Sequence, residues 1–271
     1  MIQAIDHQEA VNRAFTRQST RYDEEDRANP VLQDMRHQVY EHLDQFLKPG
    51  SHVLELNAGT GIDALHLTSL GHRVHAIDIS DGMIREIEKK IATHQRSGML
   101  TCQQLSYDQL NQVEGEFDYV FSNFGGLNCI RNLAEVTRHL PTLLKKGAYV
   151  TWVIMPPVCV WELLWIFKGH PRQAFRRFGS EGVLAHLEGE FFRTYYHSLS
   201  DIRTAFGPSF EFIKTEGLAA LSPQPHRGDF PRLHPRLYAT LRKTDALLRN
   251  NFPFNRWADH IIVTFQYNPP I

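Results

Sequence analysis

A turn between a short apolar run and a helical segment carries residue types that could bind a nucleotide-like cofactor. The turn, residues 55–61, reads ELNAGTG. Gly59 and Gly61 let a ligand approach the backbone closely and tolerate a positive φ, and Asn57 is one of the few other residues that does so. Asp78 follows Gly61 by 17 residues, about the spacing at which an acid meets a ribose diol. The pattern predicts that backbone N–H groups and one carboxylate bind a ribose-containing cofactor.

Two cofactors fit this turn. In one interpretation, Gly59, Gly61 and Ala64 form a variant of the nicotinamide-binding GxGxxG/A fingerprint, although Asn57 stands where its first glycine should follow the strand. In the other, the turn resembles that of class I S-adenosylmethionine-dependent methyltransferases, an acid followed by glycines at alternate positions. Glu55, Gly59 and Gly61 match that motif, and Asn57 replaces its first glycine. A structural turn of an unrelated α/β protein is the third and least favoured interpretation.

The resemblance to this methyltransferase family covers about residues 13–155 and the last strands. The segment 78–84, DISDGMI, resembles the part of the family in which the acid binds both ribose hydroxyls. The segment 117–120 resembles the fourth strand, and 145–148 the turn before the fifth. The segment 122–128, SNFGGLN, falls where the family lines the methyl donor. The resemblance implies S-adenosylmethionine as cofactor, S-adenosylhomocysteine as product and methyl transfer by in-line displacement.

The same resemblance implies the cofactor-binding residues. Asp78 would bind the ribose, its alternative being an acid that stabilises a helix N-terminus. Glu55 would order the glycine turn or face the sulfonium, and its alternative is a surface acid at a strand end. Arg36 would bind the cofactor's carboxylate, or else lie on a solvated helix face. The predicted set is Tyr22, Arg36, Glu55, Asn57, Ala58, Gly59, Thr60, Gly61, Asp78, Ile79, Met83, Ser106, Tyr107, Asn123 and Phe124.

The acceptor is less defined than the cofactor. Methyl transfer needs alignment and exclusion of water more than a fixed set of catalytic residues, so no catalytic residue is assigned. Tyr196 and His197 are weak candidates for a base. We expect a small-molecule acceptor whose O, N or C atom is methylated. The alternatives are a nicotinamide-dependent oxidoreductase and a non-catalytic cofactor-binding protein of the same fold.

The composition narrows the class of partner. The chain has 271 residues, of which 42% are hydrophobic and 22% charged, which is typical of a globular protein. Its formal net charge of −1 gives no basic surface for nucleic acid. The sequence contains no run of about eighteen apolar residues, so no transmembrane helix is predicted. Three separated cysteines, without CxxC or another metal-ligand spacing, predict no metal site and a reduced, cytoplasmic compartment. The oligomeric state is left open.

Alternating strands and helices are expected to position these residues. Strands are predicted at 52–56, 73–78, 100–104, 117–121 and 148–155, which indicates a parallel sheet with helices on both faces. A helix is predicted at about 131–144, and 260–267 is a clear final strand. With the resemblance, this predicts a Rossmann-like α/β fold whose seven-stranded sheet is mostly parallel, with the last strand antiparallel.

Two inserts interrupt this alternation and predict a mainly helical cap that would set the acceptor. The predicted division is N-terminal helices acting as a lid (1–50), core (51–155), cap insert (156–199), core (200–221), second cap insert (222–257) and final core strand (258–271). The aromatic stretch 158–190 is predicted to be helical. It is interpreted first as cap core, then as a pocket for an apolar acceptor. Peripheral contact of Lys168, Arg172, Arg176 and Arg177 with an anionic membrane is the least favoured interpretation.

Overall fold

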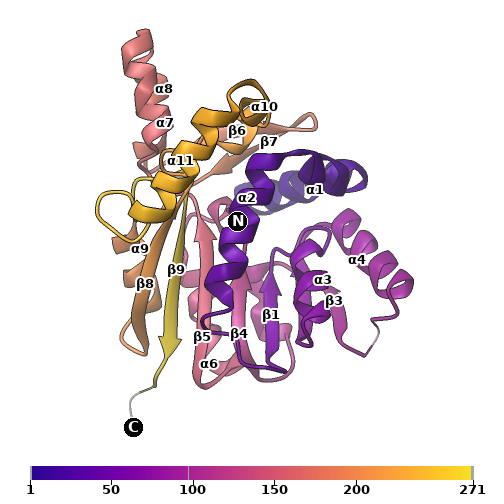
Figure 1. Cartoon of the computed structure of the whole chain (residues 1–271). Coiled ribbons are helices and arrows are strands. Elements are labelled where there is room, and N and C mark those ends of the chain that lie inside the picture. The colour runs from indigo at the N-terminus through magenta and orange to yellow at the C-terminus, as the bar shows by residue number, and fades with distance from the viewer. Residues whose placement is uncertain (1, 97, 270–271) are drawn as a thin grey trace.

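A seven-stranded sheet forms the centre of the computed structural model, which describes residues 2–96 and 98–269 (Figure 1). The strand order is β3-β2-β1-β4-β5-β9-β8. β9 is antiparallel to both of its neighbours, and the other pairs are parallel. The mostly parallel sheet with an antiparallel last strand is therefore confirmed. The strands are β1 His52–Leu56, β2 Arg73–Asp78, β3 Leu100–Gln104, β4 Phe117–Ser122, β5 Leu144–Ile154, β8 Phe210–Leu218 and β9 His260–Tyr267.

Helices cover both faces of this sheet, as predicted. Each face has its own apolar cluster, one centred on Trp152 and Phe206, the other on Met35 and Leu67. Helix starts follow local chemistry: the Asn29 side chain accepts from two backbone N–H groups at the start of α2, where Pro30 needs no partner. The helices around the sheet are α1 Ile2–Ala28, α2 Pro30–Leu43, α3 Ile62–Ser69, α4 Asp81–Thr93, α5 Ala134–Thr137, α6 Leu140–Leu143 and α9 Leu199–Phe206. Two short 3-10 segments, η1 Tyr107–Gln112 and η2 Gly126–Cys129, lie in the loops.

Two sequence predictions were wrong in detail. The single helix expected at 131–144 is two one-turn helices, α5 and α6, because Pro141 lacks the N–H that a continuous helix needs. The helix expected at 158–190 ends near residue 178, and residues 183–194 form a β-hairpin instead. Glu188 and Gly189 both have positive φ, which suits a two-residue hairpin turn.

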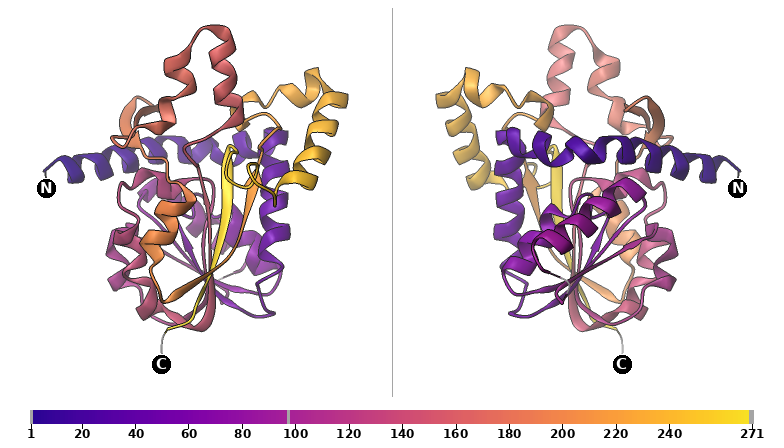
Figure 2. Two further views of the ribbon diagram at one scale, coloured as in Figure 1. Left: turned by 90° about the vertical axis from the view of Figure 1, so that its left-hand side faces the viewer. Right: turned by 90° about the vertical axis from the view of Figure 1, so that its right-hand side faces the viewer.

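The inserts lie together at one end of the sheet (Figures 1 and 2). No described helix has the length and apolar character needed to cross a membrane. The first insert contains α7 Val160–Leu163, η3 Leu164–Lys168, α8 Pro171–Ala174, η4 Arg176–Phe178, β6 Val183–Leu187 and β7 Glu190–Thr194. The second contains η5 Pro225–Arg227, α10 Phe230–Leu233 and α11 Pro235–Leu248.

Helix α1 lies across the carboxyl ends of the strands, at the same end as the inserts (Figure 2). It packs on α4 and on β7. Arg13 and Arg17 pair with Glu190 at 3.1 and 2.9 Å, and Arg21 pairs with Glu188 at 2.5 Å. We call α1 and the β6–β7 hairpin together the cover. That residues 1–50 move as a lid stays a prediction.

Candidate cofactor-binding site

A cavity of about 260 Å³ lies beneath the cover, at the carboxyl ends of β1, β2 and β4. Most of the predicted residues line it. They are Tyr22, Arg36, Asn57, Ala58, Gly59, Thr60, Asp78, Ile79, Met83, Tyr107, Asn123 and Phe124. Glu55, Gly61 and Ser106 do not line this cavity. The structure therefore brings segments far apart in the sequence to one place.

Asp78 is buried, and its carboxylate is oriented by the backbone around it. The N–H of Gly59 donates to Oδ2 and the N–H of Ser80 donates to Oδ1, both at 2.8 Å. Burial raises the pKa of Asp78 to about 6, while these backbone hydrogen bonds lower it in part. The carboxylate is therefore mostly ionised at pH 7. Its remaining lone pairs can accept hydrogen bonds from a ligand in the cavity.

The turn itself is shaped by close packing. Gly61 begins α3 with a φ of 77°, and an ideal Cβ there would lie 2.9 Å from Cγ1 of Ile87 on α4. Any side chain at position 61 would be strained and would displace α4. Gly61 therefore acts by letting α4 approach the turn, which explains why it does not face the cavity.

Asn57, which replaces the family's first glycine, ties the end of β1 to the end of β4. Its φ is 45°. Ser122 Oγ donates to its Oδ1 at 2.7 Å, and its Nδ2 donates to the carbonyl of Asn123 at 3.1 Å. An ideal Cβ on Gly126 would lie 2.2 Å from Asn57 Nδ2. The Asn57 side chain therefore occupies the space that a side chain at position 126 would need. Asn57 thus forms part of the cavity wall.

Arg36 is buried at the cavity wall and not on a solvated helix face. It pairs with Asp26 at 2.6 Å and with Asp63, which also accepts from Tyr40 and Asn123. Burial alone would lower the pKa of Arg36, but the two carboxylates raise it. Among the described lining residues, its Nε is the one buried side-chain atom without a hydrogen-bond partner. The Nε–H of Arg36 therefore remains free to donate after both pairings.

Glu55 does not order the turn by hydrogen bonding, contrary to one of its two expected roles. The Gly59 N–H is already held by Asp78, and Glu55 Oε2 has no partner. Burial and the nearby charge of Asp63 raise the pKa of Glu55 well above its ordinary value. Glu55 is also buried, so its alternative as a surface acid does not hold.

The remaining lining residues make the other end of the cavity apolar. Ile79, Met83 and Tyr107 lie there with side chains from the cover. Ser106 is buried beside them and accepts from Gln8 at 3.5 Å. Gly125 and Gly126 also line the cavity and belong to the segment 122–128 that the family resemblance placed at the methyl donor. The lining residues that were not predicted are Val11, Phe15, Ile62, Asp63, Cys129, Met155, Ala185, Phe192 and Thr194. The acid at position 63, two residues after the glycine turn, was the one usable signal among them.

Tyr196 and His197, the weak candidates for a base, lie outside the cavity. The Tyr196 ring lies beneath the Arg177 guanidinium at 4.9 Å. His197 is buried, and its Nε2 lies 3.0 Å from the carbonyl of Ile130. Both side chains have partners within the fold, and neither lines this cavity.

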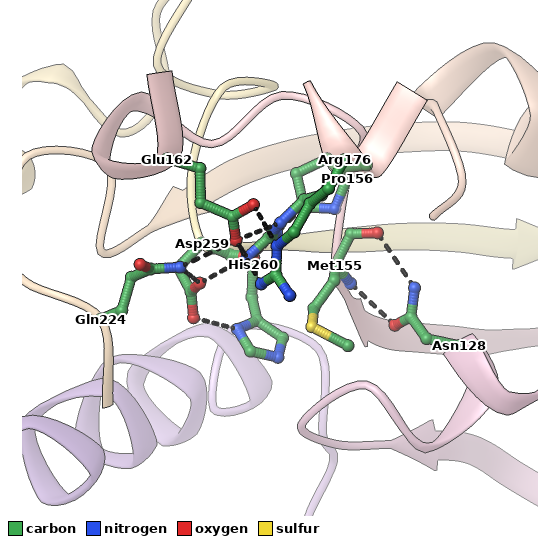
Figure 3. A network of polar contacts seen from close by, with 9 residues as sticks. Asn128, Met155, Pro156, Glu162, Arg176, Gln224, Asp259 and His260 are labelled. Carbon is green, nitrogen blue, oxygen red and sulfur yellow. Dashed lines mark hydrogen bonds and ion pairs between the residues drawn. The ribbon is translucent and has the colours of Figure 1, made fainter. Parts of the chain in front are cut away.

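A different histidine, His260, lies beside the cavity wall at the start of β9 (Figure 3). Its Nδ1 is 2.9 Å from Asp259 Oδ2. An ideal Cβ on Gly125, which lines the cavity, would lie 3.3 Å from His260 Nε2, and the Phe124 ring is edge-on to the imidazole at 5.9 Å. Within the described part of the chain, Nε2 makes no hydrogen bond. His260 is therefore an oriented imidazole with one free nitrogen.

Asp259 is held in place by a buried network that joins both inserts to β9 (Figure 3). Arg177 and Gln224 donate to its Oδ1 at 3.0 and 2.8 Å. Glu162 joins Arg177 to Arg176, at 2.7 and 2.8 Å. Burial would raise the pKa of Asp259, but the adjacent His260 and Arg177 lower it well below its usual range. Asp259 thus stays ionised next to His260.

The part of the chain that contains the glycine turn is similar to known methyltransferases. Residues 53–147 match the family model described as "Methyltransferase domain". A curated relative, the ribosomal protein L11 methyltransferase of Thermotoga maritima, is 32% identical over 97 residues, which is 35% of each chain. The chain thus spans about a third of the length of the curated relatives it matches.

Solved structures extend the similarity to the whole fold. A SAM-dependent methyltransferase of Methanosarcina mazei has a TM-score of 0.57 at 17% identity, covering 84% of this chain and 97% of that one. The magnesium protoporphyrin IX methyltransferase of Synechocystis PCC 6803, solved with bound S-adenosylhomocysteine, has a TM-score of 0.55 at 16% identity, covering 97% and 100%. The chain therefore has the Rossmann-like fold of class I S-adenosylmethionine-dependent methyltransferases.

Proposed function

We propose that this protein transfers a methyl group from S-adenosylmethionine to a small-molecule acceptor. The observation that carries the proposal is the Asp78 carboxylate, oriented by the glycine turn and facing the cavity. Its two oxygens keep lone pairs for a ribose diol. The match of residues 53–147 to a methyltransferase domain supports this cofactor over a nicotinamide.

The residues present fit such a cofactor. Asp78 would accept from the ribose hydroxyls, and Ile79, Met83 and Tyr107 offer an apolar site for the adenine. Arg36 Nε, a buried donor without a partner, would donate to the carboxylate of the amino-acid portion. When bound, S-adenosylmethionine supplies an electrophilic methyl group on a positively charged sulfur.

The contribution of the protein is to orient the reactants and exclude water. Val11 and Phe15 of α1 and Phe192 of the hairpin line the cavity with apolar side chains on the side of the cover. Orientation in such a site can supply roughly 7–11 kcal/mol of a barrier. The ionised carboxylate of Asp259 accepts a hydrogen bond from His260 Nδ1–H, so Nε2 carries no proton in the neutral imidazole. Nε2 could then take a proton from the hydroxyl group of a methyl acceptor.

A small acceptor is favoured over a macromolecule because the cavity lies under the cover and the chain carries a net charge of −1. The relative from Thermotoga maritima is named for a ribosomal protein. A match over 35% of each chain supports a shared cofactor domain and not a shared acceptor.

Calorimetric titration with S-adenosylmethionine, S-adenosylhomocysteine, NAD and NADP tests the cofactor. We expect micromolar binding of the first two only. Hydrogen bonds to a charged group contribute about 1.5–3 kcal/mol, so Asp78→Ala should weaken binding roughly 10- to 100-fold. Asp44 is an exposed acid at the end of α2, so Asp44→Ala is the matched control and should bind like the wild type. Binding of a nicotinamide cofactor, or none of the four, would refute the proposal.

A further inference from the structure

A helical arm, residues 160–178, projects from the body of the molecule (Figures 1 and 2). It consists of α7, η3, α8 and η4. Large apolar side chains are exposed along it, with Phe167 86% exposed. The others are Leu164, Ile166, Phe175 and Phe178. Five exposed large apolar side chains within fifteen residues of one projection indicate an interaction site, since single exposed ones are common but clusters are not.

The charge of the arm has one sign. Between residues 163 and 180 the sequence contains no Asp or Glu. Arg176 and Arg177 are paired with Glu162 at the base of the arm. Within the described residues, Lys168 and Arg172 form no ion pair, and Lys168 lies over the Trp165 ring at 4.9 Å. The outer part of the arm therefore combines apolar side chains with uncompensated positive charge.

The base of the arm is fixed to the body, which keeps the outer part away from it. Trp161 Nε1 donates to the carbonyl of Leu221 at 2.9 Å. Glu162 is buried and pairs with Arg177, which also pairs with Asp259. These contacts hold the start and the end of the arm to Leu221 and Asp259 of the core. The exposed apolar side chains are thus presented outward by a rigid base.

We propose that the outer arm binds the surface of an anionic lipid bilayer. Phe167 and its apolar neighbours would enter the boundary between headgroups and acyl chains, and Lys168 and Arg172 would meet lipid phosphates. The outer arm carries only positive charge, which favours an anionic partner, and its projecting shape suits a broad surface. The arm lies at the same end of the molecule as the cover, so binding would bring the cavity to the membrane side (Figure 2). The proposal does not depend on the proposed function.

Co-sedimentation of the full chain with lipid vesicles tests this. The probes are vesicles of phosphatidylcholine alone and of phosphatidylcholine with one quarter phosphatidylglycerol. We expect binding to the second kind, reduced by salt, and weak binding to the first. Full burial of one phenyl side chain corresponds to roughly tenfold or more in affinity, so Phe167→Ser should weaken binding by about that factor. Reversing both charges, with Lys168→Glu and Arg172→Glu, should also weaken it more than tenfold.

Leu247→Ser is the matched control, because Leu247 is 77% exposed on α11, outside the arm. It should bind vesicles like the wild type. Equal binding to both vesicle types, no binding, or binding unchanged by the arm variants would overturn the proposal. So would a dimer in light scattering that Phe167→Ser dissociates, because a second copy would then cover the arm. Circular dichroism checks that each variant folds. If Phe167→Ser does not fold, the variant with Lys168→Glu and Arg172→Glu still tests the proposal.

Discussion

A methyl group added at Gly126 would collide with Asn57. The ideal Cβ lies 2.2 Å from Nδ2 and 2.3 Å from Cγ of that side chain. Gly126 is not among the glycines with positive φ, so the collision alone distinguishes alanine from glycine here. Overpacking of this kind costs about 1–3 kcal/mol. We expect Gly126→Ala to lower the free energy of unfolding by that amount.

Removing the Asn57 side chain should cost a similar amount for a different reason. Ser122 is fully buried, and Asn57→Gly leaves its hydroxyl without its acceptor. An unsatisfied buried polar group costs about 1–3 kcal/mol. Asn57→Ala should cost about 1 kcal/mol more than Asn57→Gly, because it places a Cβ in the left-handed region.

The double variant separates these effects. With Asn57→Gly in place, the three nearest atoms to the added methyl are gone, so Gly126→Ala should cost close to nothing. Urea unfolding of the wild type, both single variants and the double variant measures the coupling, expected at about 1–3 kcal/mol. Gly179→Ala is the control, since nothing lies within 4 Å of its Cβ position. An equal cost of Gly126→Ala in both backgrounds would refute the steric reasoning.

Other predictions concern charge and motion. Burial raises the pKa of Asp78 to about 6, so the carboxylate becomes protonated as pH falls below 6. Calorimetry should show the affinity for S-adenosylhomocysteine falling about tenfold per pH unit in that range. Asp78→Asn should remove this pH dependence. Arg36→Met leaves two buried carboxylates unpaired and should destabilise by about 3–5 kcal/mol in urea unfolding; an unchanged midpoint would contradict this. Asp259→Asn should change the tautomer of His260, measured by the nitrogen chemical shifts of its imidazole; identical shifts would exclude the pairing. S-adenosylhomocysteine should slow tryptic cleavage at Arg21, and equal cleavage with and without it would count against closure of the cover.

The glycine turn and Asp78 of the candidate site were predictable because their signals are local. A glycine turn after an apolar run, and an acid at the end of the next run, need only neighbouring residues, and the structure places Gly59 and Asp78 in contact. The mostly parallel sheet with helices on both faces followed from the alternation of strands and helices and from the family resemblance.

The surroundings of His260 and the cover could not be predicted in this way. Asp259 and Arg177 lie 82 residues apart, and no local spacing indicates that they meet. The alternation within 183–194 was hidden by its aromatic neighbours, so a hairpin that helps to cover the cavity was interpreted as helix. Arg36 was named for its charge, but its two carboxylate partners come from other helices, which only the tertiary fold brings together.

The position of β9 has a consequence for the order of folding. β9 pairs with β5 and β8, both of which precede it in the chain. Until residues 260–267 leave the ribosome, each of those strands has an edge that only β9 fills. Such unpaired edges are prone to wrong association. Since Asp259 and His260 arrive with the same strand, synthesis completes the sheet and brings in the candidate proton acceptor in one step.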